Sequence, residues 1–246
     1  MEIVDGNKLD DGALTRLSEI YLQMWRPILD TELWECSTEE DMLGKCRKQF
    51  ASRIEIFPEG QLAVLDPAEG VMGGLSTIMV SAMDEDGQPD YGKVEGKWEY
   101  LTSFGYIDGY AHDPDGNLVI CYAINIPPEH HGKGVARALL HGGTKFAKDK
   151  GLIACPYTRP SGLDKYLKKI GFDPMQRDEL LDGIVGEYVS MRDEHGRLLD
   201  ENIGVHSHFG AEVVRIMPYS RPCDLDSWGY CVLMAYPKGY VVPLNK

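Results

Sequence analysis

The chain lacks the segments that mark a membrane protein or a secreted one. None of its apolar runs reaches the roughly 18 consecutive residues that a membrane-spanning helix needs. The N-terminal stretch MEIVDGNKLDD is acidic where a signal peptide would be basic and then apolar. We therefore expect a cytoplasmic protein with no membrane partner.

Basic residues and paired cysteines are also scarce. The 246 residues include 25 Lys and Arg against 39 Asp and Glu, and the formal net charge of −14 argues against a nucleic-acid partner. The six cysteines contain no CxxC pair, which predicts reduced core thiols and neither a disulfide framework nor a zinc site. We expect no metal. Cys155 is a candidate acyl nucleophile, although burial after a strand is the favoured interpretation.

With 43% apolar residues the chain can bury a full core. We expect one domain over residues 1–246, with insertions at about 84–116 and 173–203. Hydrophobic spacing predicts helices over 14–24, 37–50 (opened by a capping box of Ser37 with Glu40), 136–147, 162–170 and 180–189. It predicts strands over 61–65, 70–80, 118–126, 152–155, 211–217 and 229–236.

The most informative stretch, residues 117–151, reads as a strand, a glycine-bearing loop and a helix. In HGKGVA, residues 131–136, Gly132 and Gly134 allow backbone angles closed to other residues and let a phosphate approach. Backbone N–H groups exposed at a helix N-terminus form a seat for a pyrophosphate, although a pure packing role stays open. Pro127 and Pro128 have no N–H for a sheet ladder, so we expect the preceding strand to splay from its neighbour.

This motif resembles the loop of the GNAT acyltransferase superfamily, which reads Gln or Arg, two residues, Gly, one residue, and Gly or Ala; His131 stands where Gln or Arg is usual. The resemblance implies an α/β (α+β) fold with a mixed, mostly antiparallel sheet that splays at the thioester site and is flanked by helices. The ligand would be an acyl-CoA or a phosphopantetheine-linked acyl thioester. The implied cofactor contacts are Ile124, Ile126, His131, Gly132, Lys133, Gly134, Val135 and Ala136.

The superfamily places a tyrosine, as proton donor to the thiolate, four residues before a Gly-Phe-like helix end. Two segments match this pattern: 164–172, with Leu167 at that position, and 204–213, with His206. Leucine has no proton to give, and two strands follow the second segment, so we assign His206 to the catalytic-acid position. Its ordinary pKa of about 6.5 would let it donate or accept a proton near neutrality. A purely structural histidine at a helix end is the alternative.

Three residues resemble a narrower family, the GNAT-like domains of curacin-type polyketide synthase loading modules. That family uses a threonine after the fifth strand, a histidine on the later helix and an arginine fifteen residues beyond; here these are Thr158, His206 and Arg221. Trp25 matches a tunnel tryptophan. The resemblance implies decarboxylation of a malonyl or methylmalonyl thioester in polyketide chain initiation, with S-acyl transfer to an acyl carrier protein as a further step.

In that chemistry Arg221 would grip the carboxylate, Thr158 would orient it or the carbonyl, and His206 would stabilise the enolate or protonate the new methyl group. The ordinary alternatives are a solvated or ion-paired surface arginine and a threonine that is a turn residue or a helix cap. Two other functions stay open: an acetyl-CoA-dependent N-acetyltransferase acting on an amine, and a non-catalytic module that binds acyl thioesters. The implied partners are acyl-CoA and an acyl carrier protein.

Overall fold

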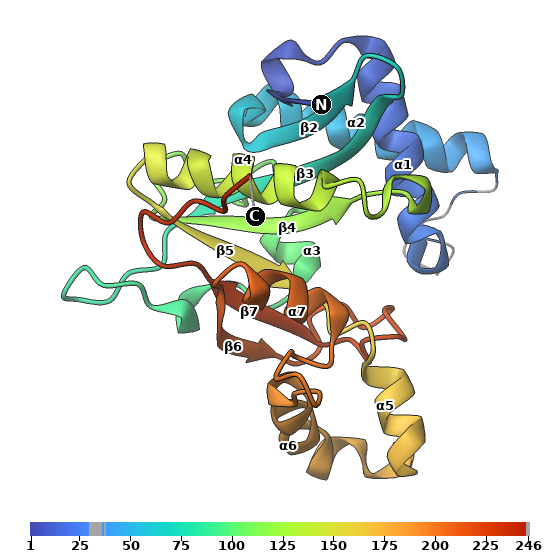
Figure 1. The fold of residues 1–246 in the computed structure, drawn as a ribbon, viewed down its shortest axis with the longest axis vertical. Coiled ribbons are helices and arrows are strands. Elements are labelled where there is room, and N and C mark those ends of the chain that lie inside the picture. Colours follow the sequence, from blue (N-terminus) through green and yellow to red (C-terminus); the bar gives the residue numbers. More distant parts are fainter. Residues whose placement is uncertain (30–35, 37, 245–246) are drawn as a thin grey trace.

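The computed structural model describes residues 1–29, 36 and 38–244, without the side chains of 176–179. A seven-stranded sheet in the order β1-β2-β3-β4-β5-β7-β6 runs through it (Figure 1). The strands are β1 (Glu2–Asp5), β2 (Gln61–Asp66), β3 (Gly70–Val80), β4 (Leu118–Asn125), β5 (Ile153–Thr158), β6 (Glu212–Met217) and β7 (Cys231–Ala235). Neighbouring strands are antiparallel except β4 and β5, which are parallel.

Seven α-helices pack around this sheet in the described part of the chain. They are α1 (Asp11–Leu29), α2 (Glu39–Ile56), α3 (Trp98–Leu101), α4 (Val135–Asp149), α5 (Leu163–Ile170), α6 (Arg177–Ser190) and α7 (Glu201–His208). Ser37, expected to open the second helix, lies outside the described residues. The described cap is Thr38, whose hydroxyl accepts from the Asp41 amide at 3.1 Å. None of the described helices has the length and apolar character to cross a bilayer.

Successive side chains of β2 are buried in two different apolar clusters, one on each face of the N-terminal half of the sheet. Leu62 and Val64 point into a cluster with Leu139 of α4, whereas Ala63 points into the cluster formed by α1 and α2. This follows from the two-residue period of a strand, which sends successive side chains to opposite faces. Helices therefore cover the sheet on both sides (Figure 1).

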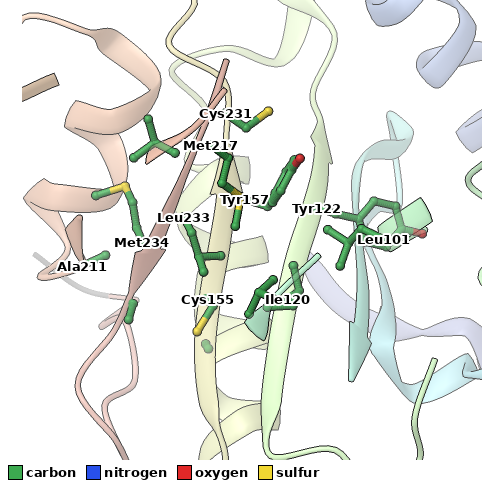
Figure 2. Close-up of a cluster of buried hydrophobic side chains, with 14 of the residues drawn as sticks. Leu101, Ile120, Tyr122, Cys155, Tyr157, Ala211, Met217, Cys231, Leu233 and Met234 are labelled. Carbon is green, nitrogen blue, oxygen red and sulfur yellow. The ribbon is translucent and has the colours of Figure 1, made fainter. Parts of the chain in front are cut away.

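The C-terminal half of the sheet encloses the largest apolar cluster. Figure 2 shows Cys155 and Tyr157 of β5 between Ile120 of β4 and Leu233 of β7. Cys155 is fully buried, and burial raises the pKa of its thiol because the thiolate would lose its hydration. Burial of Cys155, the interpretation favoured from the sequence, is confirmed.

Candidate active site

β4 and β5 separate at their carboxyl ends. Their parallel pairing runs from Leu118 with Ile153 to Cys121 with Pro156 and goes no further. Beyond that point β4 pairs only with β3, and β5 pairs with β7. The predicted splay is present, but it begins six residues before Pro127, in the pair that contains Pro156. Pro156 has no N–H to donate, so the ladder loses a hydrogen bond there.

The loop after β4 has the backbone that its glycines predicted. Gly132 and Gly134 have φ angles of 75° and 82°, a left-handed region that favours glycine, and Gly134 precedes the first residue of α4. The first-turn amides of α4 have no partner within the helix and point at this loop. The His131 ring nitrogen Nε2 lies 2.9 Å from the Ile126 carbonyl oxygen, which ties the loop to the end of β4.

A cavity of about 1310 Å³ lies between the separated strands and is lined by α1, α4, α7 and the segment after β6. It brings together most of the residues singled out from the sequence: Trp25, Ile124, Ile126, His131, Gly132, Gly134, Val135, Ala136, Thr158, His206 and Arg221. Lys133 is not among the lining residues; its ammonium forms an ion pair with Glu69 at 2.5 Å.

Arg221 contacts two indole rings. Its guanidinium carbon is 4.3 Å from the ring centroid of Trp25 and 4.3 Å from that of Trp98, and the residue is 7% exposed. Trp98 opens α3, inside the predicted 84–116 insertion, and its backbone N–H donates to the Ser220 carbonyl at 2.8 Å. Cation–π contacts stabilise such a buried cation. The solvated surface arginine that the sequence allowed is excluded.

The donors of Arg221 remain available to a ligand. Within the described part of the chain, its guanidinium makes no hydrogen bond and no ion pair. Asp224, three residues along, is paired with Arg159 at 2.6 Å. A buried cation without a carboxylate partner is costly, so the arrangement favours an anionic ligand in the cavity.

His206 is buried in the last turn of α7, with Nδ1 3.2 Å from the hydroxyl of Tyr236. Burial lowers the pKa of His206 to about 4, because the imidazolium would be desolvated. The expectation of a histidine that titrates near neutrality is therefore corrected: the imidazole is neutral at pH 7. Burial also raises the pKa of Tyr236, so its hydroxyl keeps its proton and can donate to Nδ1.

Thr158 is the last residue of β5, which is longer than the strand predicted over 152–155. It is 6% exposed, and its hydroxyl makes no hydrogen bond within the described residues. Trp25 is oriented by its own hydrogen bond, from Nε1 to the Asn125 side-chain oxygen at 2.7 Å. No group of three or more His, Cys, Asp or Glu residues in the described ranges is arranged to hold a metal ion.

Sequence reasoning missed Trp98, Tyr236 and Arg159. Trp98 stood in an aromatic-rich insertion for which a function was expected, but nothing local connected it with Arg221. Tyr236 was part of a predicted strand, and Arg159 followed Thr158 directly in TRPSG. Pro156, within the sequence of β5, was a usable signal for the position of the splay.

No family model and no curated protein matches this sequence. Solved structures do match. The loading GNATL domain of CurA from Lyngbya majuscula is 17% identical, with a TM-score of 0.62, over 90% of this chain and 93% of that one. The GphF GNAT-like decarboxylase in complex with isobutyryl-CoA is 16% identical, with a TM-score of 0.62, over 96% of this chain and 98% of that one.

An aminoglycoside 6′-N-acetyltransferase complexed with coenzyme A is also similar. It is 12% identical, with a TM-score of 0.55, and the alignment covers 99% of both chains. Likeness at these identities concerns the fold, and together with the splayed sheet it shows that this chain has the GNAT fold, as the sequence predicted.

Proposed function

We propose that the protein is a GNAT-like enzyme that decarboxylates a malonyl or methylmalonyl thioester, carried by CoA or by the phosphopantetheine arm of an acyl carrier protein, in polyketide chain initiation. One observation carries this proposal: the buried Arg221 guanidinium, in contact with two indoles, faces the cavity without a carboxylate partner among the described residues. A thioester with a terminal carboxylate supplies the missing anion. Residues 1–246 would act as one domain.

The loop supports a thioester carried on a phosphate-bearing arm. The left-handed glycines and the first-turn amides of α4 present donors to a diphosphate, or to the single phosphate of a carrier-bound arm. The edge of β4 that faces away from β3, beyond Cys121, is free to bond the amides of pantetheine. The thioester would then lie between the separated strands, near Thr158 and His206.

In the proposed reaction the bond between the α-carbon and the carboxylate breaks, CO2 leaves, and its electron pair forms an enolate on the thioester. The neutral His206 imidazole would place an N–H near the enolate oxygen while the Tyr236 hydroxyl donates to Nδ1. A neutral imidazole still carries one N–H, which can donate a hydrogen bond to the enolate oxygen. The α-carbon then takes a proton from water, which gives the methyl group of an acetyl thioester or the methylene group of a propionyl thioester, and the hydroxide left behind combines with CO2 as bicarbonate. Thr158 would hold the carboxylate out of the thioester plane.

The test is mass spectrometry of malonyl-CoA, methylmalonyl-CoA and their carrier-bound forms incubated with the wild type and variants. We expect Arg221→Gln to lower kcat/KM by about tenfold to a hundredfold, mainly through KM, because it loses charge-assisted hydrogen bonds to the carboxylate. We expect His206→Gln to lower kcat with a smaller effect on KM. Arg47→Gln, which removes an exposed ion pair with Asp11, is the matched control and should retain wild-type activity.

The rival is transfer of an acetyl group to an amine, and one feature of the cavity favours it: Glu201 lines the wall and offers a carboxylate to a cationic amine. Against it, Arg221 at the acyl end would repel an ammonium ion. If malonyl thioesters remain intact with the wild type and an amine panel is acetylated from acetyl-CoA, the function is N-acetyl transfer and the decarboxylation proposal is wrong. Tight CoA binding without turnover of any acyl form would indicate a binding module.

A further inference from the structure

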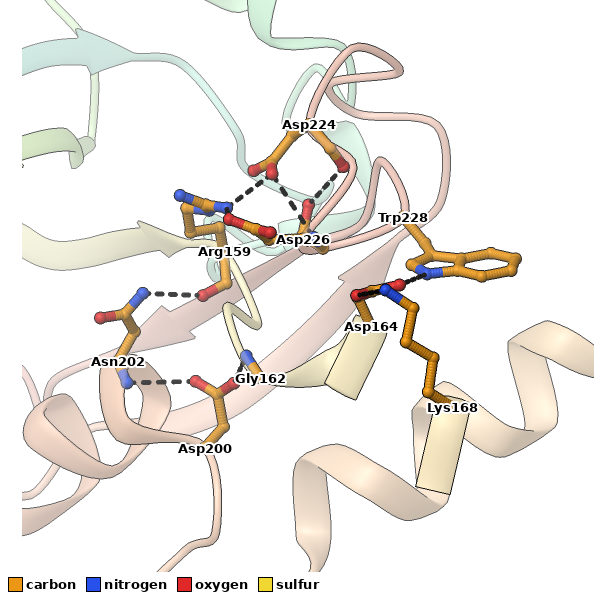
Figure 3. Close-up of polar contacts among 10 residues, drawn as sticks. Arg159, Gly162, Asp164, Lys168, Asp200, Asn202, Asp224, Asp226 and Trp228 are labelled. Carbon is orange, nitrogen blue, oxygen red and sulfur yellow. Dashed lines mark hydrogen bonds and ion pairs between the residues drawn. The ribbon is translucent and has the colours of Figure 1, made fainter. Parts of the chain in front are cut away.

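Arg159 connects the segment that carries Thr158 to the segment that carries Arg221. It follows Thr158 in the chain, and its Nη2 lies 2.6 Å from Asp224 Oδ1 and 3.0 Å from Asp226 Oδ2 (Figure 3). The Asp224 backbone N–H donates to the Arg221 carbonyl at 2.9 Å, which closes a tight turn. This ion pair therefore ties the turn that carries Arg221 to the end of β5.

The backbone of Arg159 also contacts the helix that carries His206. The Arg159 carbonyl accepts a hydrogen bond from the Asn202 side-chain nitrogen at 3.2 Å, in the first turn of α7 (Figure 3). Asp200, the N-cap of α7, accepts from the Gly162 amide at 3.0 Å, three residues beyond Arg159. Two contacts thus join the end of β5 to the start of α7.

Burial separates this pair from ordinary surface ion pairs. The Asp224 side chain is 2% exposed and that of Arg159 is 22% exposed, whereas Asp226 is 70% exposed. Removing one member would leave a buried charge unpaired, and the turn would have to move to reach water. Both aspartates engage Nη2 of Arg159, so this side chain is suited to hold the turn that contains Asp224, and its Nε is buried without a hydrogen-bond partner in the described residues.

We infer that Arg159, through its ion pair with Asp224, is a positioning residue that fixes Arg221 relative to Thr158. The effect of Arg159 on catalysis rests on the proposed function. Arg159 lines the same cavity, and its guanidinium carbon lies 5.6 Å from the ring centroid of Trp25. Because Asp224 and Asp226 engage its Nη2, it acts on the acyl carboxylate through Arg221. A misplacement of about 1 Å in such a group costs up to about a hundredfold in rate.

The test is a double-mutant cycle of Arg159→Gln and Arg221→Gln, measured as KM and kcat with malonyl-CoA and as the Kd of CoA. We expect Arg159→Gln to lower kcat/KM by about tenfold to a hundredfold through KM, with the Kd of CoA unchanged, because the diphosphate seat is untouched. In the Arg221→Gln background it should have no further effect. Asp224→Asn, which keeps the side-chain shape, should repeat the pattern, and Arg159→Lys should restore part of the activity.

Three results would overturn the inference. If Arg159→Gln lowers kcat/KM by the same factor in the wild type and in Arg221→Gln, Arg159 acts independently of Arg221. A loss no larger than that of the Arg47→Gln control would mean that it has no role. A weakened Kd for CoA in proportion to kcat/KM would mean general damage to the fold. If Arg159→Gln does not fold, Arg159→Lys and Asp224→Asn give the same decision.

A readout without turnover separates this inference from the proposed function. The Arg221 guanidinium lies over Trp25 and Trp98, so its displacement should change tryptophan emission. Because Arg159 also lies 5.6 Å from the Trp25 ring centroid, the emission is measured in a Trp25→Phe background, where the Trp98 contact of Arg221 remains. In that background we expect Arg159→Gln to change the emission as Arg221→Gln does, with no added change when both are present. A wild type that leaves malonyl-CoA, methylmalonyl-CoA and their carrier-bound forms intact would refute the proposed function. Unchanged emission with Arg159→Gln, beside altered emission with Arg221→Gln, would refute the positioning role.

Discussion

The buried imidazole of His206 should make the stability of the protein depend on pH. Its pKa is about 4 in the folded state against 6.5 for a free histidine. Between those values the unfolded chain binds a proton that the folded chain does not, so the free energy of unfolding falls as the pH falls from 6.5 toward 4. The two pKa values give a loss of about 2 kcal/mol at about pH 5 relative to about pH 7.

The assay is urea unfolding of the wild type and His206→Asn at both pH values. Other groups contribute equally to the two proteins, so the wild type should lose about 2 kcal/mol more than the variant between about pH 7 and about pH 5. His208→Asn is the control for removing a histidine from α7, because His208 is exposed. If wild type and His206→Asn lose the same free energy within about 0.5 kcal/mol, the imidazole is not held neutral by burial, and its proposed role fails with it.

Three further predictions concern the walls of the site. Gly134→Ala should lower the unfolding free energy in urea by about 1 kcal/mol and raise the Kd of CoA, because alanine is strained at a φ of 82°; an unchanged Kd would exclude the loop as the phosphate seat. Trp25→Phe should cost about 1 kcal/mol through its lost bond to Asn125 but reduce kcat/KM less than Trp25→Ala does, since the ring over Arg221 remains; equal losses would contradict the stacking role. Cys155 should resist iodoacetamide at about pH 8 until the protein is unfolded, as peptide mass mapping would show; labelling in the native state would contradict its burial.

Local signals predicted much of the fold. The hairpin expected over 61–65 and 70–80 is present as β2 and β3, because alternation and the DPAEG turn act over a few residues. The helix expected after Gly134 begins at Val135, where the left-handed glycine ends the loop. β1 was missed: four residues at the chain start carry too few alternations to show a period.

Long-range packing could not be predicted in this way. The contact of Trp98 with Arg221 joins the 84–116 segment to the turn after β6, and no periodicity within either segment encodes it. The lowered pKa of His206 has the same origin, because it depends on how completely α7, β5 and β7 exclude water. Residue types and motif spacing indicated the chemistry of the candidate site, whereas burial and pairing determine how its groups ionise.

The movement of charge during decarboxylation explains why one cation is insufficient for the proposed site. As CO2 leaves, negative charge moves from the carboxylate to the thioester oxygen, so a cation that held only the carboxylate would stabilise the substrate more than the transition state. Two indole rings lie 4.3 Å from the guanidinium carbon of Arg221, and the planar guanidinium can bind a carboxylate through its N–H groups. The oxyanion then requires donors other than Arg221, and the neutral His206 imidazole is suited to this because it keeps one N–H that can donate to the oxyanion. Division of binding and transition-state stabilisation between Arg221 and His206 is what distinguishes this chemistry from amine acetylation in the same fold.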